Sequence, residues 1–310
     1  MKALITGGGG FIGSHLADRL LAEGHEVLAL DNYSTGRRDN LAERDGLTLL
    51  EGTIVEPGTL EGALGGFDPD VVVHAAASYK DPDDWAEDVR TNALGTANVV
   101  RASQAAGVER LVYLQTALCY GTRPLEQPIT LDHPIQPDSS YAISKTAGEQ
   151  YIAMSGLDFA SFRLANAYGP RNISGPLPTF FQRLSESKPC FVMDTRRDFI
   201  YVQDLIDVLM QAVTEGKGRG YYHASSGADF SIEELFDATV AALGVELDEE
   251  VEVRPRGEDD AYTILLDPSR IRDDFGWEPR TPLAEGVAQA VDYYREFGIG
   301  ETYTHLKLGE

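Results

Sequence analysis

The segment MKALITGGGGFIGSHLADRLLAEGHEVLALD, residues 1–31, decides the fold of this chain. It begins with a short apolar run and a cluster of glycines. Apolar residues then recur at helical spacing, at Ile12, Leu16, Leu20 and Leu21, and a second apolar run, EVLAL, follows. This pattern predicts a strand, a glycine turn, a helix and a second strand at the start of the chain.

The alternation of strands and helices continues beyond this unit. Buried strands are predicted at 70–77, 110–116 and 158–165, and helices at 92–107 and 142–155. Strands that alternate with helices in this way form a parallel sheet covered on both faces. We therefore expect an α/β protein with a doubly wound parallel sheet of the Rossmann type.

The pattern changes after about residue 166, where glycine and proline become frequent. Helical spacing returns at 231–244 and 283–297. We expect a first domain over 1–165, to which a segment near 202–225 returns. The remainder, 166–310, should form a smaller C-terminal domain that binds the substrate.

Composition and charge exclude several classes of function. The chain has 310 residues, of which 43% are hydrophobic, and its 26 basic against 50 acidic residues give a net charge of −24. Such a charge argues against nucleic acid or an anionic membrane as a partner. The simplest interpretation of this charge is a solvated acidic surface, and the alternative is adaptation to a cytoplasm with a high salt concentration. No apolar run has the length of a membrane span and the first strand starts at once, so we expect a cytoplasmic protein.

Two cysteines, Cys119 and Cys190, are too few for a disulfide framework and have no Cys/His spacing of a metal site. We expect both to be reduced, and no metal site.

The glycine cluster has the spacing of a dinucleotide-binding turn. Gly7, Gly10 and Gly13 allow backbone N–H groups and a helix N-terminus to approach a pyrophosphate. Asp31 ends the second strand, where a carboxylate accepts hydrogen bonds from a ribose 2′-hydroxyl and repels a 2′-phosphate. The motif therefore favours NAD over NADP, although arginines at 37–38 offer an alternative contact for a phosphate.

A tyrosine and a lysine stand four residues apart in the segment YAISK. This spacing puts Tyr141 and Lys145 on one face of the predicted helix. A nearby ammonium stabilises a phenolate, so we expect the pKa of Tyr141 to fall toward the range of a general base.

Seven segments together resemble one family. They are TGGGGFIG, DNYSTG, TALCYG, YAISK, RLANAYGPR, RRDFIYVQD and FGWEP. In this order they are similar to the extended short-chain dehydrogenase/reductases, and within them to the nucleotide-sugar epimerases and dehydratases. QTALCYG and AAASYKDPDDW further resemble members of bacterial surface-polysaccharide pathways.

The resemblance implies roles for individual residues. Tyr141 would be the base, Lys145 would position the nicotinamide ribose, and Thr116 would hydrogen-bond to the sugar hydroxyl. Thr53 stands where the family usually has an acidic residue near the adenine. The cofactor-binding set would be Gly7, Gly10, Phe11, Ile12, Gly13, Asp31, Asn32, Ser34, Thr35, Gly36, Thr53, Ile54, Ala75, Ala76, Ala77, Asn92, Tyr141 and Lys145.

A second set would hold the nucleotide sugar, by the same resemblance. Asn166 and Arg197 match positions that contact the diphosphate, and either Arg254 or Arg256 matches a further arginine. The substrate-binding set is Lys80, Thr116, Asn166, Arg171, Arg197 and Arg256. Lys80 and Arg171 would face a carboxylate or amide of the sugar, or have a capping or solvated role instead.

Family members pair through two helices, so the resemblance also implies a homodimer. The corresponding helices are 92–107 and 142–155, and the apolar contacts expected there are Val99, Val100, Ala147 and Ile152.

The two residues after Thr116 limit which of the family's reactions this chain can catalyse. In the 4,6-dehydratases two residues such as Asp-Glu transfer protons at this point, but here Ala117 and Leu118 stand there. Epimerisation at C4 of a UDP-sugar, through a transient 4-keto sugar, needs only one base, one hydroxyl and NAD. A dehydratase, decarboxylase or reductase, or a non-catalytic NAD-binding relative, are the alternatives. Strand alternation places Cys119 away from the face of Thr116, so we expect a core thiol.

Overall fold

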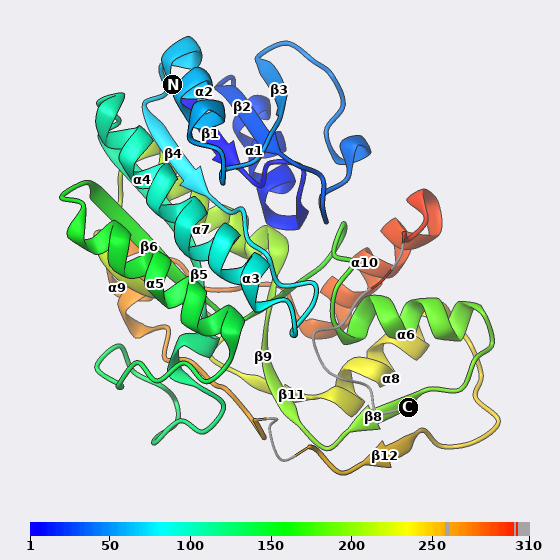
Figure 1. Ribbon diagram of the computed structural model, residues 1–310. Helices are drawn as coiled ribbons and strands as arrows, with labels where there is room; N and C mark the ends of the chain where they lie inside the picture. Colours follow the sequence, from blue (N-terminus) through cyan, green and yellow to red (C-terminus); the bar gives the residue numbers. More distant parts are fainter. Residues whose placement is uncertain (258–260, 301, 303–310) are drawn as a thin grey trace.

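The computed structural model describes residues 1–257, 261–300 and 302 (Figure 1). Its largest sheet has seven strands in the order β10-β6-β5-β4-β1-β2-β3. All neighbouring strands in it are parallel. The strands are β1 (Lys2–Thr6), β2 (Glu26–Asp31), β3 (Leu47–Glu51), β4 (Val71–His74), β5 (Arg110–Thr116), β6 (Asp158–Leu164) and β10 (Gly220–Ala224). The predicted doubly wound Rossmann fold is confirmed.

Helices cover both faces of this sheet. Those beside it are α1 (Phe11–Ala22), α2 (Pro57–Phe67), α3 (Trp85–Asp88), α4 (Thr96–Ala105), α5 (Ser140–Met154), α7 (Val202–Thr214) and α9 (Ser269–Phe275). Alternate strand residues serve opposite faces, as the period of a strand requires. Ala3 and Ile5 of β1 pack in the core that contains Leu16 of α1, whereas Leu4 packs in the core that contains Val99 of α4.

A smaller group of elements lies beneath the carboxyl edge of the large sheet in Figure 1. Its helices are α6 (Pro176–Ser185), α8 (Ile232–Leu243) and α10 (Leu283–Phe297). A three-stranded sheet joins β7 (Asn166–Tyr168), β9 (Arg196–Tyr201) and β11 (Asp229–Ser231), and a two-stranded sheet joins β8 (Phe191–Met193) and β12 (Glu252–Arg254). The chain returns to the large sheet through α7 and β10, which pairs with β6. The boundary between domains stays a prediction.

Several element boundaries differ from the sequence expectation. The strand expected at 70–77 ends at His74, and the following alanines form a loop beside the glycine turn. The helix expected at 92–107 starts earlier, with α3 and a π-helical turn over Val89–Gly95 before α4. Strand β3 and helix α2 were not predicted, since β3 is largely exposed and α2 contains four glycines.

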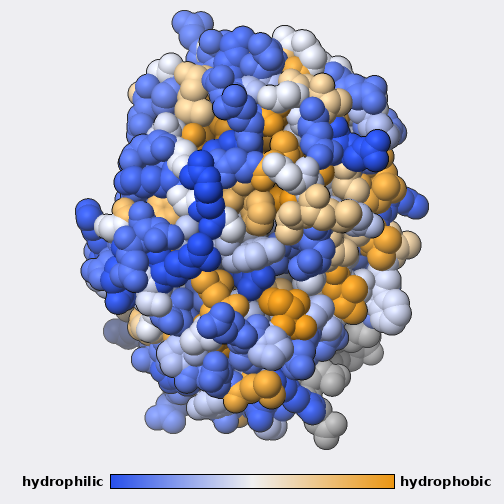
Figure 2. All heavy atoms as spheres, turned by 90° about the vertical axis from the view of Figure 1, so that its left-hand side faces the viewer, coloured by the Kyte–Doolittle hydropathy of each residue, from blue (hydrophilic) through white to orange (hydrophobic). Residues whose placement is uncertain are grey.

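The apolar residues expected at a subunit contact are mostly internal. Val99, Val100 and Ile152 are at most 5% exposed and pack in the core between α4, α5 and the sheet, so that expectation is wrong for these three side chains. Figure 2 views the molecule from the side of α4 and α5 and shows apolar side chains exposed between hydrophilic ones. The exposed apolar residues of α3, α5 and the π-helical turn are Trp85, Val89, Leu94, Ile143, Tyr151 and Met154.

Within the described residues, none of the helices combines the length and apolar character needed to cross a bilayer.

Candidate active site

The glycine turn brings backbone against backbone at the end of β1. Gly7 has φ of +70° and its N–H donates to the carbonyl of Leu30 at 2.8 Å. A Cβ at Gly7 would lie 2.7 Å from the backbone nitrogen of Ala76, and one at Gly13 would collide with the carbonyl of Gly7. Only glycine fits such an approach. The turn thereby exposes the N-terminus of α1, where a phosphate group is favoured.

Asp31 lies at the end of β2 with its carboxylate fixed by backbone groups. It accepts hydrogen bonds from Gly9 N at 2.8 Å and from Tyr33 N at 2.7 Å. Burial raises the pKa of this carboxyl, and the backbone hydrogen bonds oppose the rise. A fixed carboxylate at the end of the second strand, beside the glycine turn, fits the ribose of NAD.

The two arginines after this strand have acidic partners. Arg37 pairs with Asp39 at 2.5 Å, and Arg38 pairs with Glu51 at 2.5 Å. Arg38 also lies over the ring of Tyr33, at 4.3 Å from its centroid. Both guanidinium groups therefore already have a carboxylate partner, which agrees with a 2′-hydroxyl rather than a 2′-phosphate at this loop.

The remaining cofactor candidates surround this turn. Ser34, Thr35 and Gly36 line a cavity of about 390 Å³, together with Lys80 and residues 297–300 at and after the end of α10. Phe11 and Ile12 are half-buried at the start of α1, and Asn32 is exposed after β2. Ala75, Ala76 and Ala77 follow β4, and Thr53 and the buried Ile54 follow β3.

Asn92 connects the loop after β4 to helix α5. Its side-chain oxygen accepts from Ser78 N at 2.8 Å, and its Nδ2 donates to the Ser78 carbonyl at 2.9 Å and to Ser144 Oγ at 3.1 Å. Ser144 Oγ in turn donates to the carbonyl of Tyr141 at 2.9 Å. The asparagine therefore joins the loop after β4 to the N-terminal part of α5.

Thr116 and Tyr141 lie at the carboxyl edge of the sheet. Thr116 ends β5, and its Oγ1 accepts from Leu118 N at 3.2 Å. Tyr141 lies in the first turn of α5, which Ser139 caps by accepting from Ala142 N at 3.3 Å. Both predicted groups thus start from neighbouring segments at the edge where ligands of such sheets bind.

Lys145 lies one turn further along α5 and is 2% exposed. Its Nζ donates to the Leu114 carbonyl at 2.6 Å and lies 4.1 Å from the ring centroid of Tyr113. Burial lowers the pKa of this ammonium to about 7, and the charge of Glu149 opposes the change.

The pKa of Tyr141 differs from the sequence expectation. Burial raises it, and the neighbouring Tyr79 and Asp88 raise it further. The expectation that Lys145 lowers this pKa is wrong for the described structure, because the lysine directs its Nζ to a backbone carbonyl and its own positive charge is disfavoured by burial.

Cys119 is a core thiol, as predicted, but for a different reason. It belongs to a short 3₁₀ helix, Ala117–Tyr120, and not to a strand. The side chain is fully buried, and burial raises the pKa of the thiol to about 12. Ala117 is also buried, and Leu118 packs partly against the same core.

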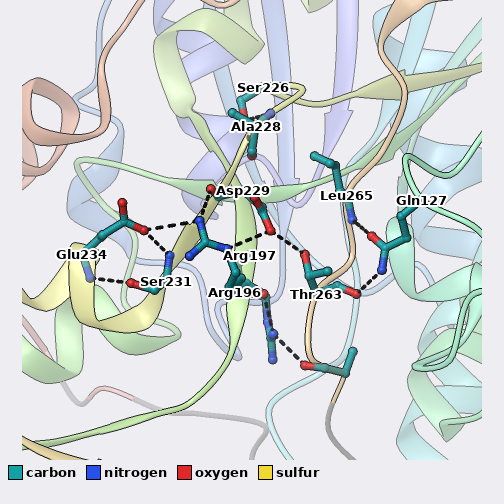
Figure 3. A network of polar contacts seen from close by, with 11 residues as sticks. Gln127, Arg196, Arg197, Ser226, Ala228, Asp229, Ser231, Glu234, Thr263 and Leu265 are labelled. Carbon is teal, nitrogen blue, oxygen red and sulfur yellow. Dashed lines mark hydrogen bonds and ion pairs between the residues drawn. The ribbon is translucent and has the colours of Figure 1, made fainter.

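Three of the predicted substrate contacts lie in the smaller group of elements. Asn166 is exposed at the start of β7 and donates to the Asp198 carbonyl at 3.1 Å. Arg197 donates to the carbonyls of Arg196 at 2.7 Å and Ala261 at 3.0 Å, within the polar network of Figure 3. Arg256 lies over the ring of Tyr262, at 5.9 Å from its centroid.

Arg171 takes a position that the sequence did not suggest. The residue has φ of +68°. Its guanidinium donates to Ser14 Oγ at 3.1 Å and to the Asp18 carboxylate at 2.6 Å, both on α1. These contacts tie the loop after β7 to the helix that follows the glycine turn.

The structure combines a Rossmann sheet and a glycine turn with a Tyr–Lys pair on the helix beyond β5 and a threonine at the end of that strand. Together these features define an extended short-chain dehydrogenase/reductase. Residues 3–224 match the model of the NAD dependent epimerase/dehydratase family. The chain belongs to this family, and NAD is the cofactor that the family uses.

Individual relatives agree with this assignment. The chain is 36% identical to a UDP-glucose 4-epimerase of Mycolicibacterium smegmatis over 95% of this chain and 99% of that protein. The Bordetella bronchiseptica enzyme WbmH, solved with NAD⁺, is 54% identical with a TM-score of 0.92, over 96% and 99% of the two chains. WbmG of the same organism, solved with NAD and UDP, is 43% identical with a TM-score of 0.91, over 99% of each chain.

Proposed function

We propose that this protein is a UDP-sugar 4-epimerase that works through a transient 4-keto sugar. The observation that carries the proposal is the set of groups around Thr116. Thr116 ends β5, and the phenol of Tyr141 and the ammonium of Lys145 belong to α5, while the two positions after the threonine hold side chains that transfer no proton, Ala117 and Leu118. The relatives named as 4-epimerases and the UDP in a similar structure support the substrate class.

Each group has one task in this reaction. Tyr141 takes the proton of the C4 hydroxyl and later returns it, while Thr116 orients that hydroxyl by a hydrogen bond. Lys145 holds the ribose of the cofactor. When bound, NAD supplies a hydride acceptor at C4 and gives the hydride back to the opposite face. The diphosphate would contact Asn166, Arg197 and Arg256.

The alternative functions agree less well with the residues at these positions. Elimination of water needs an acid and a base beside C5 and C6, and in the family's dehydratases these follow the threonine. A reductase would consume added cofactor. A non-catalytic binding protein has no use for Thr116, Tyr141 and Lys145 together.

The experiment is ¹H NMR of the NAD-loaded protein in D₂O with a panel of UDP-sugars, including uronates and N-acetylated hexosamines. A 4-epimerase converts one sugar to its C4 epimer and keeps protium at C4, because the transferred hydride returns to the same carbon. A 4-keto-6-deoxy product, release of CO₂, net formation of NADH or binding without conversion of any sugar would each contradict the proposal.

We also propose a homodimer that forms through the face of α3 and α5. Trp85 and Met154 are 67% and 77% exposed on this face, and Val89, Ile143 and Tyr151 are exposed with them. Burial of such side chains is the usual driving force of homodimers. Light scattering at micromolar concentration and moderate salt should give twice the mass of the chain, and Trp85→Asp with Met154→Asp should give a monomer. A monomeric wild type would contradict it.

A further inference from the structure

Gln115 is a buried amide that connects two elements of the site. It lies on β5 immediately before Thr116 and is 1% exposed. Its Oε1 accepts a hydrogen bond from Thr116 N at 2.9 Å, and its Nε2 donates to the carbonyl of Lys145 at 3.1 Å. One side chain therefore links the backbone of the threonine to the backbone of α5.

The early end of β4 explains why a polar side chain is needed here. β4 pairs with β5 only as far as Tyr113, so the last three residues of β5 have no strand partner on that side among the described residues. Residues two apart in a strand direct their backbone groups to the same edge. At this edge the Leu114 carbonyl accepts from Lys145 Nζ at 2.6 Å, and the Thr116 N–H donates to Gln115. The amide thus supplies the acceptor that a longer β4 would have given.

Three consecutive residues of β5 contact the same residue of α5. The hydroxyl of Tyr113 donates to the Lys145 carbonyl at 3.1 Å, beside the contacts that Leu114 and Gln115 make. The contact of Gln115 is the one that continues to Thr116. The orientation of its amide is determined, because the reversed amide would set a donor against a backbone N–H and an acceptor against a carbonyl. The amide therefore fixes where β5 ends relative to α5.

We propose that Gln115 is a positioning residue of the active site, which holds Thr116 in place relative to the helix that carries Tyr141 and Lys145. The proposed reaction needs the threonine hydroxyl and the phenol at the same sugar hydroxyl, and these two groups come from different elements. A displacement of about 1 Å at such a site lowers a rate by up to about 100-fold. This inference rests on the proposed function and adds a residue that acts through Thr116.

The first test asks whether Gln115 holds Thr116, and it needs no turnover. Amide hydrogen exchange is followed by NMR in NAD-loaded protein labelled with ¹⁵N-threonine, and Thr116→Val identifies the signal. In Gln115→Met, which keeps the length of the side chain but has no amide, Thr116 should exchange at least about tenfold faster. Thr6, in the ladder of β1, should exchange as before. Unchanged exchange at Thr116, or equal acceleration at both threonines, would overturn the proposal.

The second test asks whether catalysis depends on this link, and it is a double-mutant cycle. Gln115→Met should lower kcat by about tenfold and change KM by less than about twofold, because the misplaced group acts in the transition state. In the Thr116→Val background there is no hydroxyl to place, so the same change should lower kcat by less than about twofold. Equal losses in the two backgrounds would show that Gln115 only supports the fold.

The matched control is Gln104→Met. Gln104 of α4 also donates its Nε2 to a backbone carbonyl at α5, that of Ser155 at the C-terminal end of the helix, at 2.7 Å. This variant should leave kcat and the exchange of Thr116 unchanged. A tenfold loss of kcat here would assign the effect to α5 as a whole and contradict the role of Gln115.

A second variant covers the case in which Gln115→Met does not fold. Gln115→Asn keeps a buried amide on a side chain that is one methylene too short to join both partners. It must give the same faster exchange at Thr116 and the same loss of kcat that disappears in the Thr116→Val background. If it behaves as wild type in both measurements, the proposal is wrong.

The two tests separate this inference from the proposed reaction. If no UDP-sugar is converted but Thr116 exchanges faster in Gln115→Met, the proposed reaction fails, and the link from Gln115 to Thr116 stands. If sugar is converted and the exchange of Thr116 is the same in both proteins, the role of Gln115 fails and the reaction stands.

Discussion

Lys145 Nζ donates a hydrogen bond to the backbone carbonyl of Leu114 at 2.6 Å, so helix α5 is attached to β5 two residues before Thr116. The carbonyl satisfies one of the three ammonium donors, and the ring of Tyr113 covers part of the group. The site therefore holds a lysine whose positive charge is only partly compensated in the absence of ligand.

This arrangement predicts a pH dependence of stability for the cofactor-free protein. Burial lowers the pKa of Lys145 from 10.5 to about 7, so between these values the unfolded chain binds a proton that the folded chain does not. Stability then rises with pH across this window, and below pH 7 the unfavourable contribution is complete. In thermal melts, the gain in stability of Lys145→Met over wild type should be largest near pH 7 and shrink toward pH 10. A gap that is constant or grows with pH would show that Lys145 is not buried as described.

Tyr141→Phe should abolish most turnover and leave NAD bound, because the fold and the glycine turn are untouched. Thr116→Val keeps the shape of the side chain but removes its hydrogen bond to the reacting hydroxyl. Its rate should fall by about one to three orders of magnitude. Both rates are measured on the same sugar, with the NAD content of each preparation determined after denaturation. A Thr116→Val variant slower than Tyr141→Phe would reverse the two roles.

Cys119→Ser should keep turnover within a few-fold of wild type and lose stability. The thiol is fully buried in the core, and a serine there would place a hydroxyl among apolar groups at a cost of about 1–2 kcal/mol. Urea unfolding and turnover are compared on one preparation. An inactive, folded and NAD-bound Cys119→Ser beside a half-active Tyr141→Phe would make the thiol the reactive group.

Asp31→Ala should reduce the preference for NAD over NADP, because the carboxylate that repels a 2′-phosphate is lost. The backbone of Gly9 and Tyr33 also loses an acceptor, so affinity for NAD should fall as well. Isothermal titration with both cofactors measures the two effects. Equal affinity of the wild type for NAD and NADP would refute the role of Asp31.

Gly7→Ala should destabilise the protein by more than about 1 kcal/mol and prevent retention of NAD, since φ is positive and the added Cβ meets the backbone of Ala76. The matched control is Gly58→Ala in α2, where a Cβ would meet no atom within 4 Å. This second change should stabilise the helix by about 0.5–1 kcal/mol. Similar effects of both substitutions on stability would contradict the conclusion that close backbone packing requires glycine at position 7.

The sequence by itself determined the features that depend on neighbouring residues. The first β–α–β unit follows from periodicity, and the spacing of Tyr141 and Lys145 follows from one helical turn. Glycines at 7, 10 and 13 indicated the dinucleotide turn, because such a turn needs residues without a Cβ at fixed intervals.

Only the tertiary structure decided which other residues these side chains contact. The sequence could not show that Arg171 binds Asp18 of α1 or that Val99 faces the core, since each depends on how distant helices pack. The pKa of Tyr141 was misjudged for the same reason: spacing indicates which charges are near along one helix, but burial and the charges of other elements decide which protonation state is favoured.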